Sequence, residues 1–397
     1  MKNFFLSVLV IVSTFPIFGQ ETRQVLFEAG RDGYYTYRIP SIVATKKGSL
    51  LVFCSARKGS GGDYDPIDIV MRRSADGGKT WSDMKVIVHK ENTPCDNPEP
   101  IVDFMTGEIH MLYQIGYAQC FYIKSSDDGL TWSVPVDITY AIEEFKEVIS
   151  WNVLAPGPGH GIKMTNGRLV VPFWLSPAGK NHRPSIVVSV YSDDNGRTWK
   201  AGDIAIPDND LTVNPSETCC VQLADGRVMF ISRNESLNYR KLVTYSHDGA
   251  TNWSDAVFAD AFFNPVCMAS ICRYSIQPFQ SKNRILFCNP DSRQDPWTAE
   301  KPKTALSAKY RHRTNLTIRM SYDEGLTWPV SKVIDPGFAG YSDLAVTPDG
   351  QIHCLYEGGS LTGDNYLSTH VTIVSFNLEW LTDGKDKLNK KDKPLFK

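Results

Sequence analysis

The sequence of 397 residues predicts an all-β fold, a six-bladed β-propeller of four-stranded antiparallel blades. A peptide of the form Ser-x-Asp-x-Gly-x-Thr-Trp recurs along the chain, and short segments rich in β-branched residues flank each copy. No long stretch has the apolar periodicity of a helix. The five copies of this repeat peptide, the fourth of them degenerate, occupy residues 74–81, 125–132, 192–199, 246–253 and 321–328.

The repeat peptide itself predicts a tight turn. Its Asp and Gly supply the side-chain acceptor and the positive φ angle that such a turn needs, and its Trp can bury a ring between neighbouring units. The aspartates are therefore expected to be structural, and neither catalytic nor calcium-binding. In the fourth copy Ala250 and Asn252 replace Gly and Thr, which predicts a looser turn. The other copies carry Asp76, Asp127, Asp194 and Asp323.

A strand is expected before each copy and another after its Trp, so each copy joins two strands of a hairpin. About six blades are expected because the start of the chain and the stretch 257–292, which lacks the peptide, must also pair with a neighbour. The strands expected before the copies cover residues 67–71, 120–123, 185–191, 242–245 and 316–320. Further strands are expected at 50–53, 168–173, 227–231 and 352–356.

The N-terminus has the pattern of a secretory signal peptide. Lys2 precedes an apolar run at residues 4–18 that is too short for a membrane span, and the segment ends on Gly19 and Gln20. We expect residues 1–20 to be removed and the mature chain to be exported to the periplasm or the medium, with no stable membrane span. No Cys stands at the junction, which argues against a lipoprotein anchor.

Composition predicts one large domain followed by a tail. With 42% hydrophobic residues the chain can bury a large core, and we assign residues 21–382 to the propeller. Residues 383–397 are rich in Lys and poor in apolar residues, so we expect a disordered, solvated tail. The net charge of −2 offers no basic surface for nucleic acid. Ligand binding is therefore expected at individual pockets and not over an extended charged surface.

The nine cysteines are expected to be mainly structural. Neither the adjacent pair Cys219 and Cys220 nor the pair Cys267 and Cys272 has a partner at zinc-binding spacing. We expect no metal or organic cofactor and at most two disulfides. Four further cysteines lie inside apolar strands, where a thiol is a small hydrophobe; they are Cys54, Cys120, Cys288 and Cys354.

Three arginines stand far apart in the sequence but are expected to converge. Arg38 precedes Ile39 and Pro40 at the entry to the first blade, and Arg233 and Arg313 lie at strand ends in later blades. Side chains from separate blades meet only at the propeller axis. Such a cluster of cations needs an anion to hold it together.

A Gly-rich loop at residues 58–64 contains a candidate acidic residue for the same site. It begins directly after Arg57 and carries Asp63, so it can hold a carboxyl group over a pocket. Asp65 and Asp68 compete with Asp63 for this role. Asp65 precedes a Pro in a turn, and Asp68 alternates with Ile on a strand, so both are interpreted as structural.

The ordered motifs resemble those of the exo-α-sialidases (neuraminidases) of the retaining bacterial and animal type, which carry Asp-box (BNR) repeats. The resemblance runs from about Tyr37 to Trp380, essentially the whole mature chain. It implies retaining hydrolysis of terminal α-linked sialic acid from glycoproteins, glycolipids and oligosaccharides through a covalent tyrosyl-sialosyl intermediate. The motifs that carry it lie at residues 37–40, 214–217, 232–234, 313–316, 341–343 and 355–357.

The resemblance also implies roles for particular residues. The three arginines would bind the sialic acid carboxylate, and Glu357 would hold Arg38. Tyr341 would be the nucleophile and Glu217 its base. Asp63 would be the acid/base, and Arg57 and Asn97 would contact O4 and the N-acetyl end of the ring. The family often has Asp where this chain has Asn97.

Elementary electrostatics favours a neutral nucleophile for such a substrate. A carboxylate attacking the anomeric carbon would approach the fixed charge of the sugar, and at about 4 Å with an effective dielectric near 20 the repulsion is roughly 4 kcal/mol. A phenol avoids this repulsion, provided that a base accepts its proton.

Two other functions remain open at this stage. One is an enzyme for another nonulosonic acid, or one that releases an anhydro product. The other is a non-catalytic sialic-acid-binding propeller, although a lectin would need the arginines and not Asp63, Glu217 and Tyr341. His160, in the loop 157–162, is interpreted as a spacer that could also line a pocket.

Overall fold

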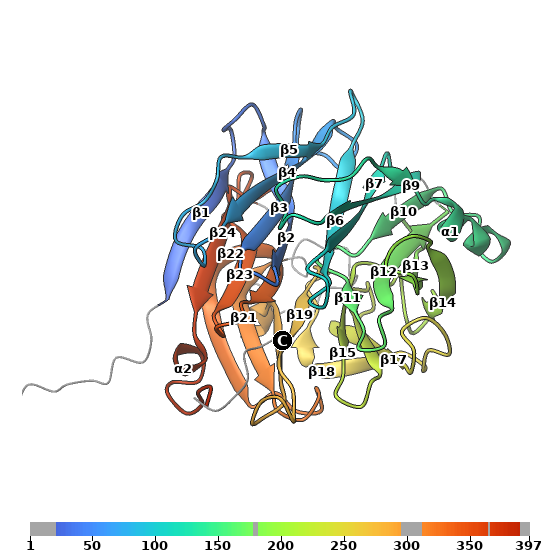
Figure 1. Cartoon of the computed structure of the whole chain (residues 1–397). Coiled ribbons are helices and arrows are strands. Elements are labelled where there is room, and N and C mark those ends of the chain that lie inside the picture. Colours follow the sequence, from blue (N-terminus) through green and yellow to red (C-terminus); the bar gives the residue numbers. More distant parts are fainter. Residues whose placement is uncertain (1–20, 178–181, 295–311, 364–365, 390–397) are drawn as a thin grey trace, which may run out of the picture.

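The computed structural model describes residues 21–177, 182–294, 312–363 and 366–389. The predicted signal peptide, residues 1–20, lies outside this part of the chain. The described residues form an all-β, propeller-like arrangement in which twisted antiparallel sheets stand around a centre (Figure 1). The predicted all-β class is confirmed. The described helices are short: α1 (Tyr140–Glu143), η1 (Glu144–Glu147), η3 (Ser292–Gln294) and α2 (Leu378–Leu381).

Four of the described sheets follow one another along the chain. The first contains β2 (Thr36–Ala44), β3 (Leu50–Arg57), β4 (Ile67–Ser74) and β5 (Lys85–Val88), and the second contains β6 (Cys95–Val102), β7 (Ile109–Ile115), β8 (Gln119–Ser125) and β9 (Val136–Asp137). The third contains β10 (Val153–Pro156), β11 (Ile162–Lys163), β12 (Leu169–Ser176), β13 (Ile186–Ser192) and β14 (Lys200–Ile206). The fourth contains β15 (Thr218–Gln222), β16 (Val228–Ser232), β17 (Arg240–Ser246) and β18 (Val257–Phe263).

The remaining sheet joins the two ends of the fold. Strand β24 pairs with β1, the first strand of the chain, so a partner exists for the N-terminal segment as predicted (Figure 1). The stretch after residue 257 also finds partners, since β18 pairs with β17 and β19 pairs with β20. The strands of this sheet are β19 (Ser270–Ser275), β20 (Arg284–Pro290), β21 (Thr314–Ser321), β22 (Val330–Val346), β23 (Ile352–Gly358), β24 (His370–Phe376) and β1 (Thr22–Glu28).

The repeat peptide forms the predicted hairpin turn, and its hydrogen bonds explain its sequence. In the first copy Oδ1 of Asp76 accepts the N–H of Thr80 at 2.9 Å, and Oδ2 accepts the Thr80 hydroxyl at 2.6 Å. Ser74 closes the other side by accepting the N–H of Gly78 at 2.8 Å. The turn connects β4 with β5, which pair with each other. Asp76 is thus a structural turn residue.

The fourth copy still closes but less tightly. Thr251 stands one place earlier than Thr in the other copies, and its hydroxyl lies 3.1 Å from Oδ2 of Asp248, against 2.6 Å in the first copy. The expected looser turn is confirmed, because the shifted Thr cannot reach the carboxylate as closely.

The core lies between neighbouring sheets, where the Trp of the repeat peptide packs. Trp132, from the second sheet, meets Phe53 on β3 of the first sheet at 5.9 Å between ring centroids in an edge-to-face arrangement. Trp199, from the third sheet, lies 5.7 Å from the ring of Tyr122 on β8. In these two copies the Trp joins its sheet to the preceding one.

The C-terminal segment corrects part of the sequence-based prediction. The sequence predicts a disordered tail over residues 383–397, yet Asp386 is buried and its carboxylate accepts hydrogen bonds from Nε and Nη2 of Arg284, both at 2.8 Å. Tyr322 donates to the same carboxylate at 2.8 Å. The buried guanidinium of Arg284 needs a counter-charge, and Asp386 supplies it. The rest of the predicted tail lies outside the described residues.

All nine cysteines are buried free thiols. The sulfur atoms of Cys288 and Cys354 lie 3.8 Å apart without a bond between them. Within the described residues, helices stay well below the length and apolarity that crossing a membrane requires.

Candidate active site

A polar pocket of about 190 Å³ opens at one end of the inner strands. Every predicted site residue except Glu357 lines it, and Glu357 lies directly behind Arg38. The residues arrive from several sheets, as expected for side chains that meet near the axis. The predicted residues that line the pocket are Arg38, Arg57, Asp63, Asn97, Glu217, Arg233, Arg313 and Tyr341.

β-Bulges in three strands aim side chains into this pocket. The pairing register of β2 shifts between Arg38 and Ser41, that of β6 between Asp96 and Glu99, and that of β22 between Ala339 and Ser342. Ile39 and Asn97 adopt positive φ angles of 54° and 57°, which are unusual for residues other than Gly. A bulge breaks the alternation of side chains along a strand, so Arg38, Asn97 and Tyr341 can point along the axis.

Glu357 on β23 fixes both Arg38 and the backbone that carries Tyr341. Its carboxylate lies 3.2 Å from Nε of Arg38 and accepts the N–H groups of Ile39 at 2.9 Å and Tyr341 at 3.1 Å. Arg38 and Glu357 are each 2% exposed, so the ion pair is almost fully removed from water. The Arg38 guanidinium lies 4.9 Å from the centroid of the Tyr341 ring.

Tyr341, Glu217 and Arg233 form a compact triad. The Tyr341 hydroxyl donates a short hydrogen bond to Oε1 of Glu217. Nη1 of Arg233 contacts both partners, at 2.5 Å from Oε2 of Glu217 and 2.7 Å from the Tyr341 oxygen. The phenol therefore has a proton acceptor and a cation within direct reach.

The protonation states in this triad follow from burial and charge. Burial raises the pKa of Tyr341, the Glu217 charge raises it further, and the neighbouring arginines lower it, with a net pKa well above the ordinary value. Burial also raises the pKa of Glu217, but the charge of Arg233 and the hydrogen bond from Tyr341 outweigh it, so the net pKa is lowered. The resting pair is a neutral phenol beside a carboxylate.

Arg313 completes a cationic wall. Its Nη2 donates to the carbonyl of Val266 at 2.8 Å, and its guanidinium lies 5.2 Å from the Tyr341 ring centroid. Its Nε and Nη1 are buried and have no hydrogen-bond partner among the described residues. A buried guanidinium with unused donors favours an anionic ligand.

Asp63 is held as a carboxylate by two neighbours. Nη1 of Arg57 donates to its Oδ1 at 2.7 Å, and the Tyr366 hydroxyl donates to its Oδ2 at 2.9 Å. Burial raises the pKa of Asp63, but the Arg57 and Arg38 charges and these hydrogen bonds outweigh it and lower the pKa well below the usual range. Arg57 also donates to the loop carbonyl of Gly61 at 3.0 Å, which orders the loop that carries Asp63.

The two competing acids lie outside the pocket. Asp65 accepts the N–H groups of Ser60 at 2.8 Å and Gly62 at 3.1 Å, so it shapes the Gly-rich loop. Asp68 accepts the Tyr34 hydroxyl at 2.7 Å on a strand. Both have the structural positions that the sequence predicts.

Asn97 lines the pocket, whereas its neighbour Asp96 lies beneath it. Nδ2 of Asn97 donates to the carbonyl of Pro156 at 3.1 Å. Asp96 is fully buried and bonded to Ser55 and Arg57, with a contact of 3.3 Å from Nη2 of Arg57. The acid next to Asn97 thus supports Arg57 and does not face the pocket.

Several pocket residues were missed by sequence reasoning because they lie outside the motifs, either in loops or, for Trp174, on β12. Tyr117 and Trp174 form an aromatic wall with His182, at 5.1 Å between His182 and each of the other two ring centroids. Arg183 and Glu235 form an adjoining ion pair with an Nη2–Oε1 distance of 2.5 Å. Their only signal in the sequence was the clustering of aromatic and charged residues near Pro and Gly.

Among the described residues, one group could offer three metal ligands: Asp103, Glu108 and His110. Nζ of Lys163 lies 2.6 Å from Asp103, and Nζ of Lys124 lies 2.8 Å from Glu108. Lysine ammonium groups already balance both carboxylates, and none of these residues lines the pocket.

The fold and this pocket define a class of protein, a β-propeller with an arginine-rich site for an anion around a tyrosine–glutamate pair. Residues 48–354 match the family model of the BNR repeat-like domain. The chain is 30% identical to a sialidase of Paraclostridium sordellii over 359 residues, which cover 81% of each chain. This chain belongs to the sialidase family with BNR repeats.

Two further comparisons agree with this assignment. A sialidase of Micromonospora viridifaciens is 32% identical over 389 residues, which cover 91% of this chain but only 54% of that relative. Our chain thus spans about half the length of that protein. A solved structure of a Hadza microbial sialidase superposes with a TM-score of 0.71 at 26% identity, covering 90% of this chain and 69% of the other.

Proposed function

We propose that this protein is an exo-α-sialidase that hydrolyses terminal α-linked sialic acid from glycoconjugates with retention of configuration. The observation that carries the proposal is the convergence of Arg38, Arg233 and Arg313 around the Tyr341–Glu217 pair. The arginines suit a carboxylate on the anomeric carbon of the substrate. The substrates would be sialylated glycoproteins, glycolipids and oligosaccharides.

Tyr341 would act as the nucleophile. Its phenol is neutral, so it can approach the anomeric carbon without repulsion from the carboxylate of the sugar. Glu217 would accept the phenolic proton along the existing hydrogen bond as the new C–O bond forms. The arginines stabilise the phenolate character that develops on the oxygen.

Asp63 would act as the acid/base. Arg57 and Tyr366 stabilise its carboxylate, the form that would activate water in the second step. The first step needs a protonated Asp63 to deliver a proton to the leaving oxygen. We infer that substrate binding weakens the Arg57–Asp63 pair and so permits protonation.

Arg57 and Asn97 would bind the O4 and N-acetyl side of the sugar ring. Both side chains lie in the pocket wall. An enzyme for another nonulosonic acid, or one that forms an anhydro product, would share the same arginines and tyrosine.

One experiment separates these possibilities. The purified chain is incubated with a fluorogenic N-acetylneuraminide and with its deaminated analogue, and the released sugar is identified by NMR. The proposal is supported if free N-acetylneuraminic acid is released faster than the deaminated sugar and appears first as the α-anomer. No release from either substrate would favour a binding propeller, and an anhydro sugar would identify an intramolecular transfer.

We propose that the propeller has six blades. The support is the division of β22: residues up to Phe338 pair with β21, whereas those from Ala339 onward pair with β23. A strand that changes partner midway can belong to two four-stranded units, and the seven-stranded sheet then counts as two blades.

We also propose export of the mature chain, to the periplasm or the medium. The support is the pattern of residues 1–20, in which a basic start precedes a short apolar run and a small residue. Mass spectrometry of the processed N-terminus from cell fractions tests this proposal, and an intact Met1 in the cytoplasmic fraction alone would overturn it.

A further inference from the structure

A second and larger cavity, of about 380 Å³, lies at the opposite end of the inner strands. On β2, Arg38 lines the pocket described above and Val43 lines this cavity. On β22, Tyr341 lines the pocket, and Leu344 and Val346 line the cavity. The same inner strands thus carry two separate sites, and we refer to the second as the distal cavity.

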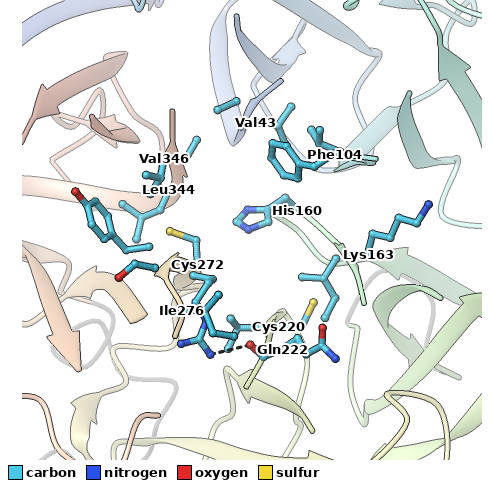
Figure 2. A pocket seen from close by; sticks show the side chains of 18 of the residues that line it. Val43, Phe104, His160, Lys163, Cys220, Gln222, Cys272, Ile276, Leu344 and Val346 are labelled. Atoms are coloured by element: carbon cyan, nitrogen blue, oxygen red, sulfur yellow. Dashed lines mark hydrogen bonds between the residues drawn. The ribbon is translucent and has the colours of Figure 1, made fainter. Parts of the chain in front are cut away.

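The walls of the distal cavity are mainly apolar. Figure 2 shows Val43, Phe104, Ile276, Leu344 and Val346 around its interior. Its volume falls within the range of typical small-molecule sites, about 300–1,000 Å³. Apolar walls of this extent hold water poorly, so an apolar ligand would gain free energy by covering them.

The imidazole of His160 projects into this mainly apolar space (Figure 2). Its Nδ1 lies 2.8 Å from Oδ1 of Asp343, and this carboxylate also accepts the N–H groups of Ile42 and Leu344, each at 2.9 Å. Both oxygens of Asp343 already accept backbone N–H groups, so we assign the proton of this contact to Nδ1 of His160, which leaves Nε2 for the cavity. The sequence had suggested only a spacer or a pocket-lining role for His160.

The charged side chains in the described lining of the cavity are basic: His160, Lys163 and Arg273. Each pairs with a carboxylate that lies outside the lining, namely Asp343, Asp103 and Glu324. Lys163 and Arg273 are thereby balanced, so His160 is the group that we consider for a ligand. Burial lowers the pKa of His160, but the charge and hydrogen bond of Asp343 outweigh it and raise the net pKa above the ordinary value. Nε2 can therefore donate to an anionic group.

We propose that the distal cavity is a second binding site, for a small apolar molecule that carries one carboxylate. The carboxylate binds Nε2 of His160, and the apolar part packs against Val43, Leu344 and Val346. The site is independent of the enzymatic activity proposed above, because it shares no lining residue with the catalytic pocket.

Calorimetry with octanoate and octanol tests the site. Octanoate is expected to bind with a stoichiometry of one, and octanol at least about tenfold more weakly, since it lacks the charge that pairs with His160. A planar sialic acid analogue that fills the catalytic pocket should not displace octanoate. Displacement, or octanol binding as tightly as octanoate, would overturn the proposal.

Two variants test the residues. His160→Asn removes Nε2 but keeps an amide that can donate to Asp343, so octanoate affinity should fall about tenfold while octanol affinity stays the same. Val346→Phe should fill the cavity and weaken both ligands. Its matched control is Val333→Phe on the same strand, where Val333 is 47% exposed and lies outside the cavity. Equal effects of the two Phe variants would contradict the proposal.

A crystallographic measurement keeps the proposal testable if a variant fails to fold. Crystals of the unmodified protein are soaked with bromo-octanoate, and the anomalous signal of bromine locates the ligand. The expected position is among Val43, Leu344 and Val346, with the carboxylate near His160. Bromine bound only elsewhere, or no bound bromine at saturating ligand, would overturn the assignment.

Discussion

The hydroxyl of Tyr341 donates a hydrogen bond to Glu217, a residue 124 positions away in the sequence. Arg233 contacts both groups through the same nitrogen, Nη1. A phenol, a carboxylate and a guanidinium thus share one hydrogen-bond network at the bottom of the pocket. This arrangement lets a proton leave the phenol without any movement of the protein backbone.

Tyr341→Phe should abolish turnover and leave binding nearly intact. The substitution removes the proposed attacking oxygen but keeps the arginines that we propose bind the carboxylate, so kcat should fall by several orders of magnitude. Steady-state kinetics and calorimetry with a planar sialic acid analogue measure the two effects. Near-normal turnover would refute the role of Tyr341.

Asp63→Ala should affect substrates according to their leaving groups. Natural sialosides have poor leaving groups that need a proton, which we propose Asp63 supplies, whereas the aryl group of an aryl sialoside leaves with little protonation. We expect kcat/KM to fall at least about a hundredfold more for a sialyl-lactose than for an aryl sialoside. Asp65→Ala is the comparison variant, because Asp65 lies outside the pocket and holds the N–H groups of Ser60 and Gly62, so its loss should lower kcat/KM for both substrates alike. Equal losses for both substrates would move the role to another residue.

The sequence predicts the main features of the fold and the site because its motifs determine local hydrogen bonding. The repeat peptide specifies a turn through its own Ser, Asp and Thr, so the hairpins were predictable without knowledge of the rest of the chain. The resemblance supplied the roles of residues such as Arg38 and Glu357, which meet only after the last sheet has closed.

The bulges and the loop residues could not be predicted in this way. The positive φ of Ile39 has no signature in the sequence, because β-branched residues disfavour it and only the surrounding sheet enforces it. Tyr366 reaches Asp63 from more than three hundred residues away, in a loop without a motif. Composition places Asp386 in a tail, because composition contains no information on the pairing of Asp386 with the buried Arg284.

Asp386→Asn should destabilise the fold in a pH-dependent way. Burial raises the pKa of Asp386, but hydrogen bonds from Arg284 and Tyr322 outweigh it and lower the pKa from 3.8 to about 2. Because the folded-state pKa is depressed, this stabilisation is present above the unfolded pKa near 4 and is lost as the pH falls towards 2. The variant also leaves Arg284 buried without its counter-charge, at a cost on the order of 3 kcal/mol at neutral pH.

Denaturant unfolding at several pH values measures this effect. The difference in unfolding free energy between the wild type and Asp386→Asn should be largest at neutral pH and shrink as the pH approaches 2. Asp383→Asn is the control, since the Asp383 side chain is 66% exposed in its ion pair with Lys332 and should contribute little. A pH-independent difference would mean that Asp386 acts through packing and not through its charge.

The last prediction concerns Arg313 and separates recognition of a carboxylate from support of the fold. Arg313→Lys keeps the charge but loses the planar arrangement of donors, so it cannot both bind the Val266 carbonyl and engage a carboxylate through two nitrogens. Affinity for a planar, carboxylate-bearing analogue should fall by roughly 2–4 kcal/mol, with the melting temperature within a few degrees of the wild type. The uncharged ester of the analogue should bind the wild type poorly and lose little further in the variant. Calorimetry measures the affinity of the wild type and of the variant for the acid and for the ester. Equal losses of affinity for acid and ester would show that Arg313 does not bind the carboxylate.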